Sequence, residues 1–207
     1  MKMRTLTILL LVLGVLATLM ILHRGWSPDV AKVQGSRLFD QFPVNEVASL
    51  TVISANNTAS LVKKEGGWVV EERFSYPADF GKIANLVRTL KEVKVGRQFA
   101  GSDETLRRLA LKDPEDPAAT DTEKGIRLLL KDDKQKILVS ILLDQQRNLN
   151  NKKPDIPGRY VRLGNESTVY LVDERFATVR KAPTTWLDST LLKFPAADIK
   201  RISCTST

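Results

Sequence analysis

The side chains of this chain that could do chemistry are mainly carboxylates, because the common nucleophile and base pairs are missing. The one histidine, His23, directly follows an apolar segment, which excludes a Ser-His-Asp or Cys-His arrangement from the rest of the chain. The one cysteine, Cys204, belongs to the last four residues, and no C-x-x-C motif occurs. A zinc site therefore lacks its nitrogen and sulfur ligands, and we expect no metal and no cofactor.

Paired carboxylates could hydrolyse a glycan, one acting as the acid and the other as base or nucleophile. Asp79 and Asp188 are the best candidates, although each also suits the start of a helix. The aromatic residues Trp68, Tyr76 and Trp186 could line a groove for a glycan or a peptide. Core packing is the alternative use of all three.

The segment 112–124 is rich in acids and raises the question of calcium. Its spacing does not match a calcium loop, and no glycine stands at the turn position that such a loop requires. We therefore predict a solvated loop without metal. The acids concerned are Asp113, Glu115, Asp116, Asp121 and Glu123.

The apolar run Thr5–Leu22 is long enough to anchor the chain in a membrane. It contains no charge and, as a helix, would span about 27 Å. Lys2 and Arg4 precede it, so we expect residues 1–4 in the cytoplasm and the rest outside, as in a single-pass inner-membrane protein with a periplasmic or extracellular domain. A cleaved signal peptide is the alternative, but no small-x-small site follows Leu22.

The charge balance argues against a nucleic-acid partner. The net charge is +8, from 32 Lys and Arg against 24 Asp and Glu, and three of the positive residues flank the apolar run. The remaining excess is spread thinly and has no interleaved aromatic platform. We expect a protein partner in the envelope and only weak attraction to anionic lipids.

After a tether at 23–40, residues 41–203 are predicted to form one α+β domain, and 204–207 a tail. Short strands in meanders and hairpins should form antiparallel sheets covered by amphipathic helices. One helix is expected from Pro77 to about Gly96, with Phe80, Ile83, Val87, Leu90 and Val93 on its buried face. A shorter helix should begin after Ser102 and bury Leu106 and Leu109.

The predicted strands are 47–54, 59–64, 68–72, 126–131, 136–143, 159–163 and 168–172. We also expect a helix over 174–180 capped by Asp173, and a helical segment over 183–192. The segment from Phe194 repeats the Phe-Pro pattern of Phe42, so a further strand should begin near Ile199. This strand could close the sheet or open a second unit.

The order of motifs along residues 38–203 resembles the domain-of-unknown-function family 4340. The motifs that carry the resemblance are Phe42-Pro43, Gly67-Trp68-Val69-Val70, Tyr76-Pro77-Ala78-Asp79, Leu111-Lys112-Asp113-Pro114, Gly158-Arg159-Tyr160-Val161-Arg162-Leu163, Val169-Tyr170-Leu171-Val172 and Trp186-Leu187-Asp188. The resemblance implies an exported, membrane-anchored protein, and some members accompany ABC transporters of the gliding-motility type. It implies no catalytic residues.

Two functions follow as expectations. The first is a non-catalytic, membrane-anchored interaction domain outside the cytoplasm, an accessory subunit of an ABC transporter or envelope complex. The second is a carboxylate-based hydrolase of envelope glycan, or a glycan-binding module. The first fits the missing catalytic groups better.

Overall fold

The computed structural model describes residues 34–145 and 158–190 of the chain. The chain divides into two units, 1–32 and 33–207, and the described residues belong to the second. Within them, no helix is both long and apolar enough to cross a bilayer. The predicted anchor at 5–22, most of the tether, the strand expected near Ile199 and the tail lie outside the described residues.

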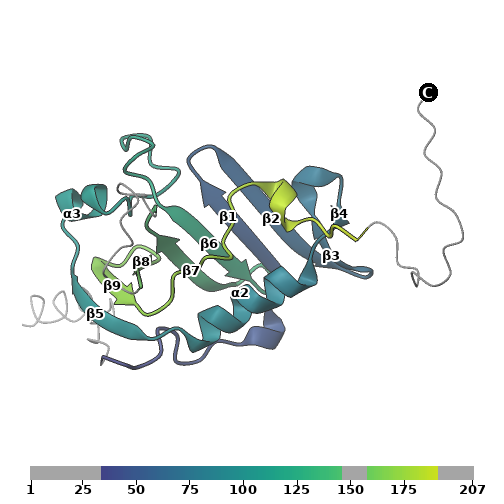
Figure 1. The fold of residues 1–207 in the computed structure, drawn as a ribbon, viewed down its shortest axis with the longest axis horizontal. Helices are drawn as coiled ribbons and strands as arrows, with labels where there is room; N and C mark the ends of the chain where they lie inside the picture. Colours follow the sequence, from purple (N-terminus) through teal and green to yellow (C-terminus); the bar gives the residue numbers. More distant parts are fainter. Residues whose placement is uncertain (1–33, 146–157, 191–207) are drawn as a thin grey trace, which may run out of the picture. The chain divides into compact units, whose positions relative to one another are not determined.

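The described residues form one antiparallel sheet of nine strands in the order β4-β3-β2-β1-β6-β7-β8-β9-β5 (Figure 1). This confirms the α+β class, with a single sheet. The sequence neighbours β1, β2, β3 and β4 form a meander at one end, and the other end closes with β5 beside β9. The strands are β1 Ser49–Ser54, β2 Asn57–Lys64, β3 Gly67–Val70, β4 Tyr76–Pro77, β5 Val95–Ala100, β6 Ile126–Lys131, β7 Ile137–Leu143, β8 Arg159–Leu163 and β9 Thr168–Val172.

The helix α2, Phe80–Glu92, lies across one face of this sheet (Figure 1). It buries a stripe of aliphatic residues at helical spacing, Ile83, Leu86, Val87 and Leu90. Asp79 caps it, since its Oδ1 accepts a hydrogen bond from the Lys82 N–H at 3.2 Å. The stripe packs on the strand residues that alternate toward the same face, so this layer holds the main core.

A smaller core lies on the other face of the sheet. It contains Leu106 of α3 (Asp103–Arg108), Leu111, Leu142 and Val169. Leu142 points away from the main core because its neighbours Ile141 and Leu143 belong to that core and a strand alternates. As predicted, α3 is capped by Ser102, whose Oγ accepts from the Thr105 N–H at 3.2 Å.

Three short 3-10 segments complete the described structure: η1 Val44–Glu46, η2 Glu71–Arg73 and η3 Pro183–Trp186. Flanking segments also pair with both edge strands. On the outer side of β5, the Gly35 N–H donates to the Val95 carbonyl at 2.7 Å. On the outer side of β4, the Asp188 N–H donates to the Pro77 carbonyl at 2.9 Å. Leu38 is fully buried, so packed structure reaches into the segment predicted as tether.

Several local predictions are wrong. Pro77 belongs to β4 rather than to the first helical turn, and α2 ends at Glu92, followed by the unpredicted strand β5. Phe80 is 63 % exposed instead of buried. No helix covers 174–180, because Asp173 accepts a hydrogen bond from the Lys94 N–H across the sheet instead of capping a following turn. Of the segment 183–192, the short η3 is helical within the described residues.

Candidate binding groove

A groove of about 490 Å³ lies between the exposed side of α2, the segment η1 and the strands β2 and β3. We call it the Trp68 groove. Its lining is mainly apolar and also includes polar and charged side chains. The lining residues are Val44, Asn45, Val47, Lys63, Trp68, Phe80, Ile83, Ala84, Val87, Arg88, Lys91 and Glu92.

One stripe of α2 forms the helical wall. Phe80, Ala84, Val87 and Lys91 recur at intervals of three and four, which places them on one side of the helix. This stripe lies beside the one that faces the sheet, so its apolar members continue the core outward. Phe80 begins the helix directly after the Asp79 cap and is the most exposed aromatic residue of the groove.

The sheet provides the facing wall. Lys63 on β2 and Trp68 on β3 are directly paired across the strands, so their side chains lie side by side on the same face. Trp68 is half-buried against the main core. Its carbonyl accepts a hydrogen bond from the Ala78 N–H at 2.8 Å, which holds the entry to α2 close to the strand.

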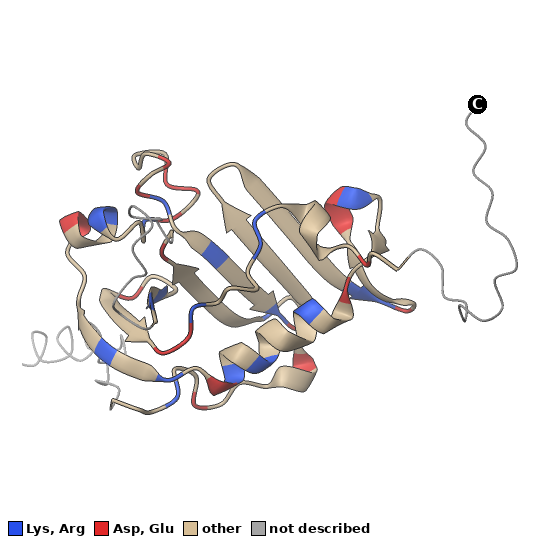
Figure 2. Ribbon diagram, in the orientation of Figure 1, with Lys and Arg blue, Asp and Glu red and all other residues tan. Residues whose placement is uncertain are grey.

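Three cations at the groove have no partner among the described residues. The side chains of Lys63, Arg88 and Lys91 make no hydrogen bond or ion pair there. Glu92 is the one acidic residue of the lining. Figure 2 shows basic residues along the visible side of α2. The groove therefore combines exposed apolar surface with net positive charge.

The three aromatic residues predicted as a groove have different environments. Trp68 does line the Trp68 groove, and Tyr76 on β4 is 38 % exposed. Trp186 is fully buried, and its Nε1–H donates to the Arg180 carbonyl at 2.9 Å, so it serves the core. Phe80 is the aromatic residue of the groove that sequence reasoning placed in the core. Phe80 stands at the first turn of an amphipathic helix, and this position alone does not show whether its side chain faces the core or a groove.

The two candidate catalytic carboxylates both have local structural roles. Asp79 caps α2 and forms an ion pair with the Lys82 ammonium at 3.2 Å. The Oδ1 of Asp188 accepts from the Thr190 N–H at 2.8 Å. Neither residue is among those that line the Trp68 groove. Ser60 and Lys63 have the S-x-x-K spacing of a serine nucleophile with its lysine, which sequence reasoning overlooked. Both belong to β2, and residues three apart on a strand point to opposite faces, so they do not form such a pair.

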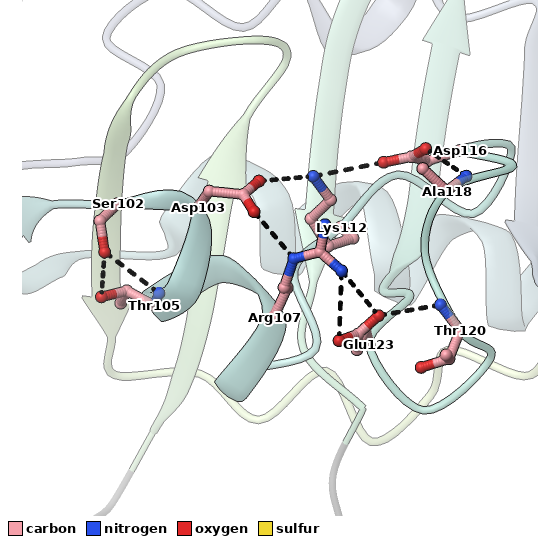
Figure 3. A network of polar contacts seen from close by, with 9 residues as sticks. All are labelled: Ser102, Asp103, Thr105, Arg107, Lys112, Asp116, Ala118, Thr120 and Glu123. Carbon is pink, nitrogen blue, oxygen red and sulfur yellow. Dashed lines mark hydrogen bonds and ion pairs between the residues drawn. The ribbon is translucent and has the colours of Figure 1, made fainter.

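The acidic segment 112–124 is held by ion pairs on both sides (Figure 3). Lys112 contacts Asp103 at 2.7 Å and Asp116 at 3.3 Å, while Arg107 contacts Asp103 at 2.8 Å and Glu123 at 3.3 Å. Hydrogen bonds from Arg107 and Lys112 lower the pKa of Asp103 to about 2. These ion pairs join α3 to the loop 112–124. We call the set of Asp103, Arg107, Lys112, Asp116 and Glu123 the charge clamp.

The remaining acids of this segment are also paired. Arg127 of β6 forms ion pairs with Asp113 and, at 2.7 Å, with Glu115, and Lys124 lies 3.7 Å from Asp121. Among the described residues, no group of three metal-ligating side chains comes together. The loop predicted to be solvated does expose Glu115 and Asp121, and its acids are also ion-paired. Lys112 and Lys124 pair within the segment, while Arg107 and Arg127 come from the flanking elements α3 and β6.

Asp144 is the described carboxyl group whose pKa is raised, and burial is the main cause. The Arg159 guanidinium opposes that rise, since its Nε lies 2.7 Å from the Asp144 Oδ1. Arg159 also donates to the carbonyl groups of Arg175, at 3.2 Å, and of Asp144. This saturated pair ties the end of β7 to β8 and does not line the Trp68 groove.

Comparison with known proteins gives one match. A family model described as "Domain of unknown function (DUF4340)" matches residues 68–207, which is more than half of the chain. No curated protein and no solved structure matches. The matched part includes Trp68, all of α2 and the charge clamp.

Proposed function

The chain belongs to the DUF4340 family of domains of unknown function, and from this premise we propose that it is a membrane-anchored, non-catalytic interaction domain that binds a protein partner outside the cytoplasm. Residues 5–22 would hold it in the inner membrane, with the α+β domain in the periplasm or outside the cell. The apolar run and its basic flank support this orientation.

The observation that carries the proposal is the combination of exposed aromatic surface and unpaired charge at the Trp68 groove. Phe80 is 63 % exposed in the lining of the groove, and three cations without a partner among the described residues line the same groove. Aromatic and arginine side chains contribute most of the binding energy at protein interfaces. Positive charge around an apolar centre would also steer an acidic partner into place.

A wider depression of about 860 Å³ adjoins the groove and shares Asn45, Val47 and Lys63 with it. It adds further charged groups from the turn after β6, including Asp132 and Lys134. A partner seated in the groove could extend over this surface, which would give an apolar centre with a polar rim.

The carboxylate positions give less support to a glycan hydrolase. Such an enzyme needs an acid with a raised pKa beside a second carboxylate in a cleft. Asp79 and Asp188 accept hydrogen bonds from backbone N–H groups, and the half-buried Asp144, whose pKa is raised, is paired with Arg159. A role as accessory subunit of an ABC transporter or another envelope complex fits a domain that binds without reacting.

Photo-crosslinking in native membranes tests the proposal. A photoreactive amino acid replaces Phe80 in the full chain, and a matched variant carries it at Glu104, an exposed position on α3. We expect a discrete higher-mass adduct from position 80 and none from position 104. The pair of substitutions Arg88→Glu and Lys91→Glu should weaken the adduct about 10-fold, equivalent to about 1.4 kcal/mol of binding free energy.

The proposal fails if position 80 gives no adduct, or if both positions give the same pattern. Recovery of the chain in the soluble cytosolic fraction would contradict the anchor. Thermal unfolding of each variant shows whether a lost adduct reflects lost folding instead of lost binding.

A further inference from the structure

Arg162 of β8 lies on the face of the sheet opposite α2, beside the smaller core. It is directly paired with Leu142 on β7 and with Val169 on β9, and both of these residues are buried. Directly paired residues share a face, so the aliphatic part of Arg162 lies between two apolar side chains. The guanidinium group is held at the boundary between the smaller core and solvent.

The polar atoms of Arg162 have no partner within the described residues. Its Nε is buried and makes no hydrogen bond, and its side chain forms no ion pair. Burial lowers the pKa of Arg162, and the charge of Arg127 lowers it further. A buried donor without an acceptor is costly, and so are neighbouring like charges.

Arg127 stands in the same row of the sheet, two strands away. Leu142 pairs with both arginines, so the two Cα atoms are about 10 Å apart, within reach of two long side chains. Asp113 and Glu115 already pair with Arg127. The row therefore contains one satisfied and one unsatisfied arginine.

Arg159 on the same strand shows how a structural buried arginine is satisfied in this protein. It faces the main core, and its nitrogens are used by the Asp144 carboxylate and by the carbonyl groups of Asp144 and Arg175. Arg162, three residues later and on the opposite face, has none of these. The difference indicates that the acceptor for Arg162 comes from outside the described residues of the domain.

We propose that Arg162 is the anchor of an oxyanion-binding site that accepts the carboxylate or phosphate group of a small ligand. The Nε and a terminal nitrogen of a guanidinium form a planar fork that matches two oxygens of either group. Arg127 in the same row is already paired with Asp113 and Glu115, so Arg162 supplies the positive charge of the site, and Leu142 and Val169 provide an apolar border. This site is on the face opposite the Trp68 groove and does not depend on the function proposed for that groove.

Thermal unfolding of the full chain in detergent tests this site with inorganic phosphate and acetate as probes, each against chloride at equal ionic strength. We expect at least one probe to raise the Tm of the wild-type chain. Arg162→Met should abolish that rise, and its Tm in chloride should equal or exceed the wild-type Tm, because an unpaired buried charge has been removed. A response to phosphate alone identifies a phosphate ligand, and a response to acetate identifies a carboxylate.

Arg97→Met is the matched control, since Arg97 is an exposed arginine of β5 that likewise has no ion pair among the described residues. It should keep the full response to the probe. The proposal is overturned if neither probe raises the wild-type Tm, if Arg162→Met keeps the response, or if Arg97→Met loses it equally. A marked decrease in the Tm of Arg162→Met in chloride would also overturn it, because the arginine would then be structural.

Discussion

The Trp68 groove and the charge clamp are both rich in charged residues, but they use their charges differently. In the charge clamp, Asp103, Arg107, Lys112, Asp116 and Glu123 are all paired with one another (Figure 3). In the groove, the three cations have no partner in the described part of the chain, and an exposed phenylalanine lines the same depression. Charges that satisfy one another hold a loop in place, whereas unpaired charges around apolar surface are available to a partner.

The largest effect should come from neither region but from the core beside the groove. Trp186→Ala should lower the free energy of unfolding by about 3–5 kcal/mol, because it removes a fully buried aromatic side chain and leaves a cavity. Chemical denaturation of the full chain in detergent measures this change. The backbone carbonyl of Trp186 accepts a hydrogen bond from the Asp79 N–H at the start of α2. The substitution retains this hydrogen bond, because it changes only the side chain.

This variant sets the scale for a folding defect, against which changes in the groove are judged. A loss below about 1 kcal/mol would show that Trp186 is not a core residue and would reopen the prediction that it lines a binding surface.

A matched pair of lysine substitutions compares the two regions directly. Lys112→Ala should destabilise the chain by up to about 1 kcal/mol, because the Lys112 side chain is only 16 % exposed and joins the more exposed Asp103 to Asp116. Lys91→Ala should change stability by less than about 0.5 kcal/mol, because Lys91 has no partner among the described residues. Equal effects in the two variants would erase the distinction between paired and unpaired charges.

The smallest effect concerns acid. The pKa of Asp103 is lowered from 3.8 to about 2 by Arg107 and Lys112, and the pKa values of Asp116 and Glu123 are lowered as well. A depressed pKa in the folded state means that the stabilisation is complete above about pH 5 and is lost as the pH falls toward 2. Hydrogen exchange in α3 and the loop 112–124 should therefore become faster over this range, relative to α2, after correction for the intrinsic pH dependence.

The helix α2, which lines the groove, is the reference in the same experiment. Protection of α2 that declined together with that of α3 would indicate global unfolding. In that case the pH dependence would not report on the charge clamp.

Local patterns in the sequence predicted most of the fold. The strands β6, β8 and β9 have the predicted bounds, and α3 begins after the predicted cap at Ser102. Alternation and capping depend on neighbouring residues, so they can be read directly from the chain. The strand β5 was missed because Val95–Ala100 contains a glycine and a bulge, and its partner β9 is about 70 residues away.

The candidate groove was predicted in part. Trp68 is half-buried and lines the groove, whereas Phe80 was predicted in the core and is exposed, and Trp186 was predicted in a groove and is buried. Both have the composition of a core residue, and burial depends on what packs against them. The segment 183–188 comes to lie beside β4 and takes Trp186 inside, while nothing described covers the mouth of the groove at Phe80.

By itself, the sequence determined the α+β class, the alternation of the strands, the cap of α3 and the family, because each of these is written in residues close together along the chain. Only the tertiary structure decided which charges are paired. The acids of 113–123 meet Arg107 and Arg127 through the packing of α3 and β6, while Lys63, Arg88 and Arg162 remain without partners among the described residues. An ion pair depends on distances between side chains in space, and spacing along the chain does not fix those distances.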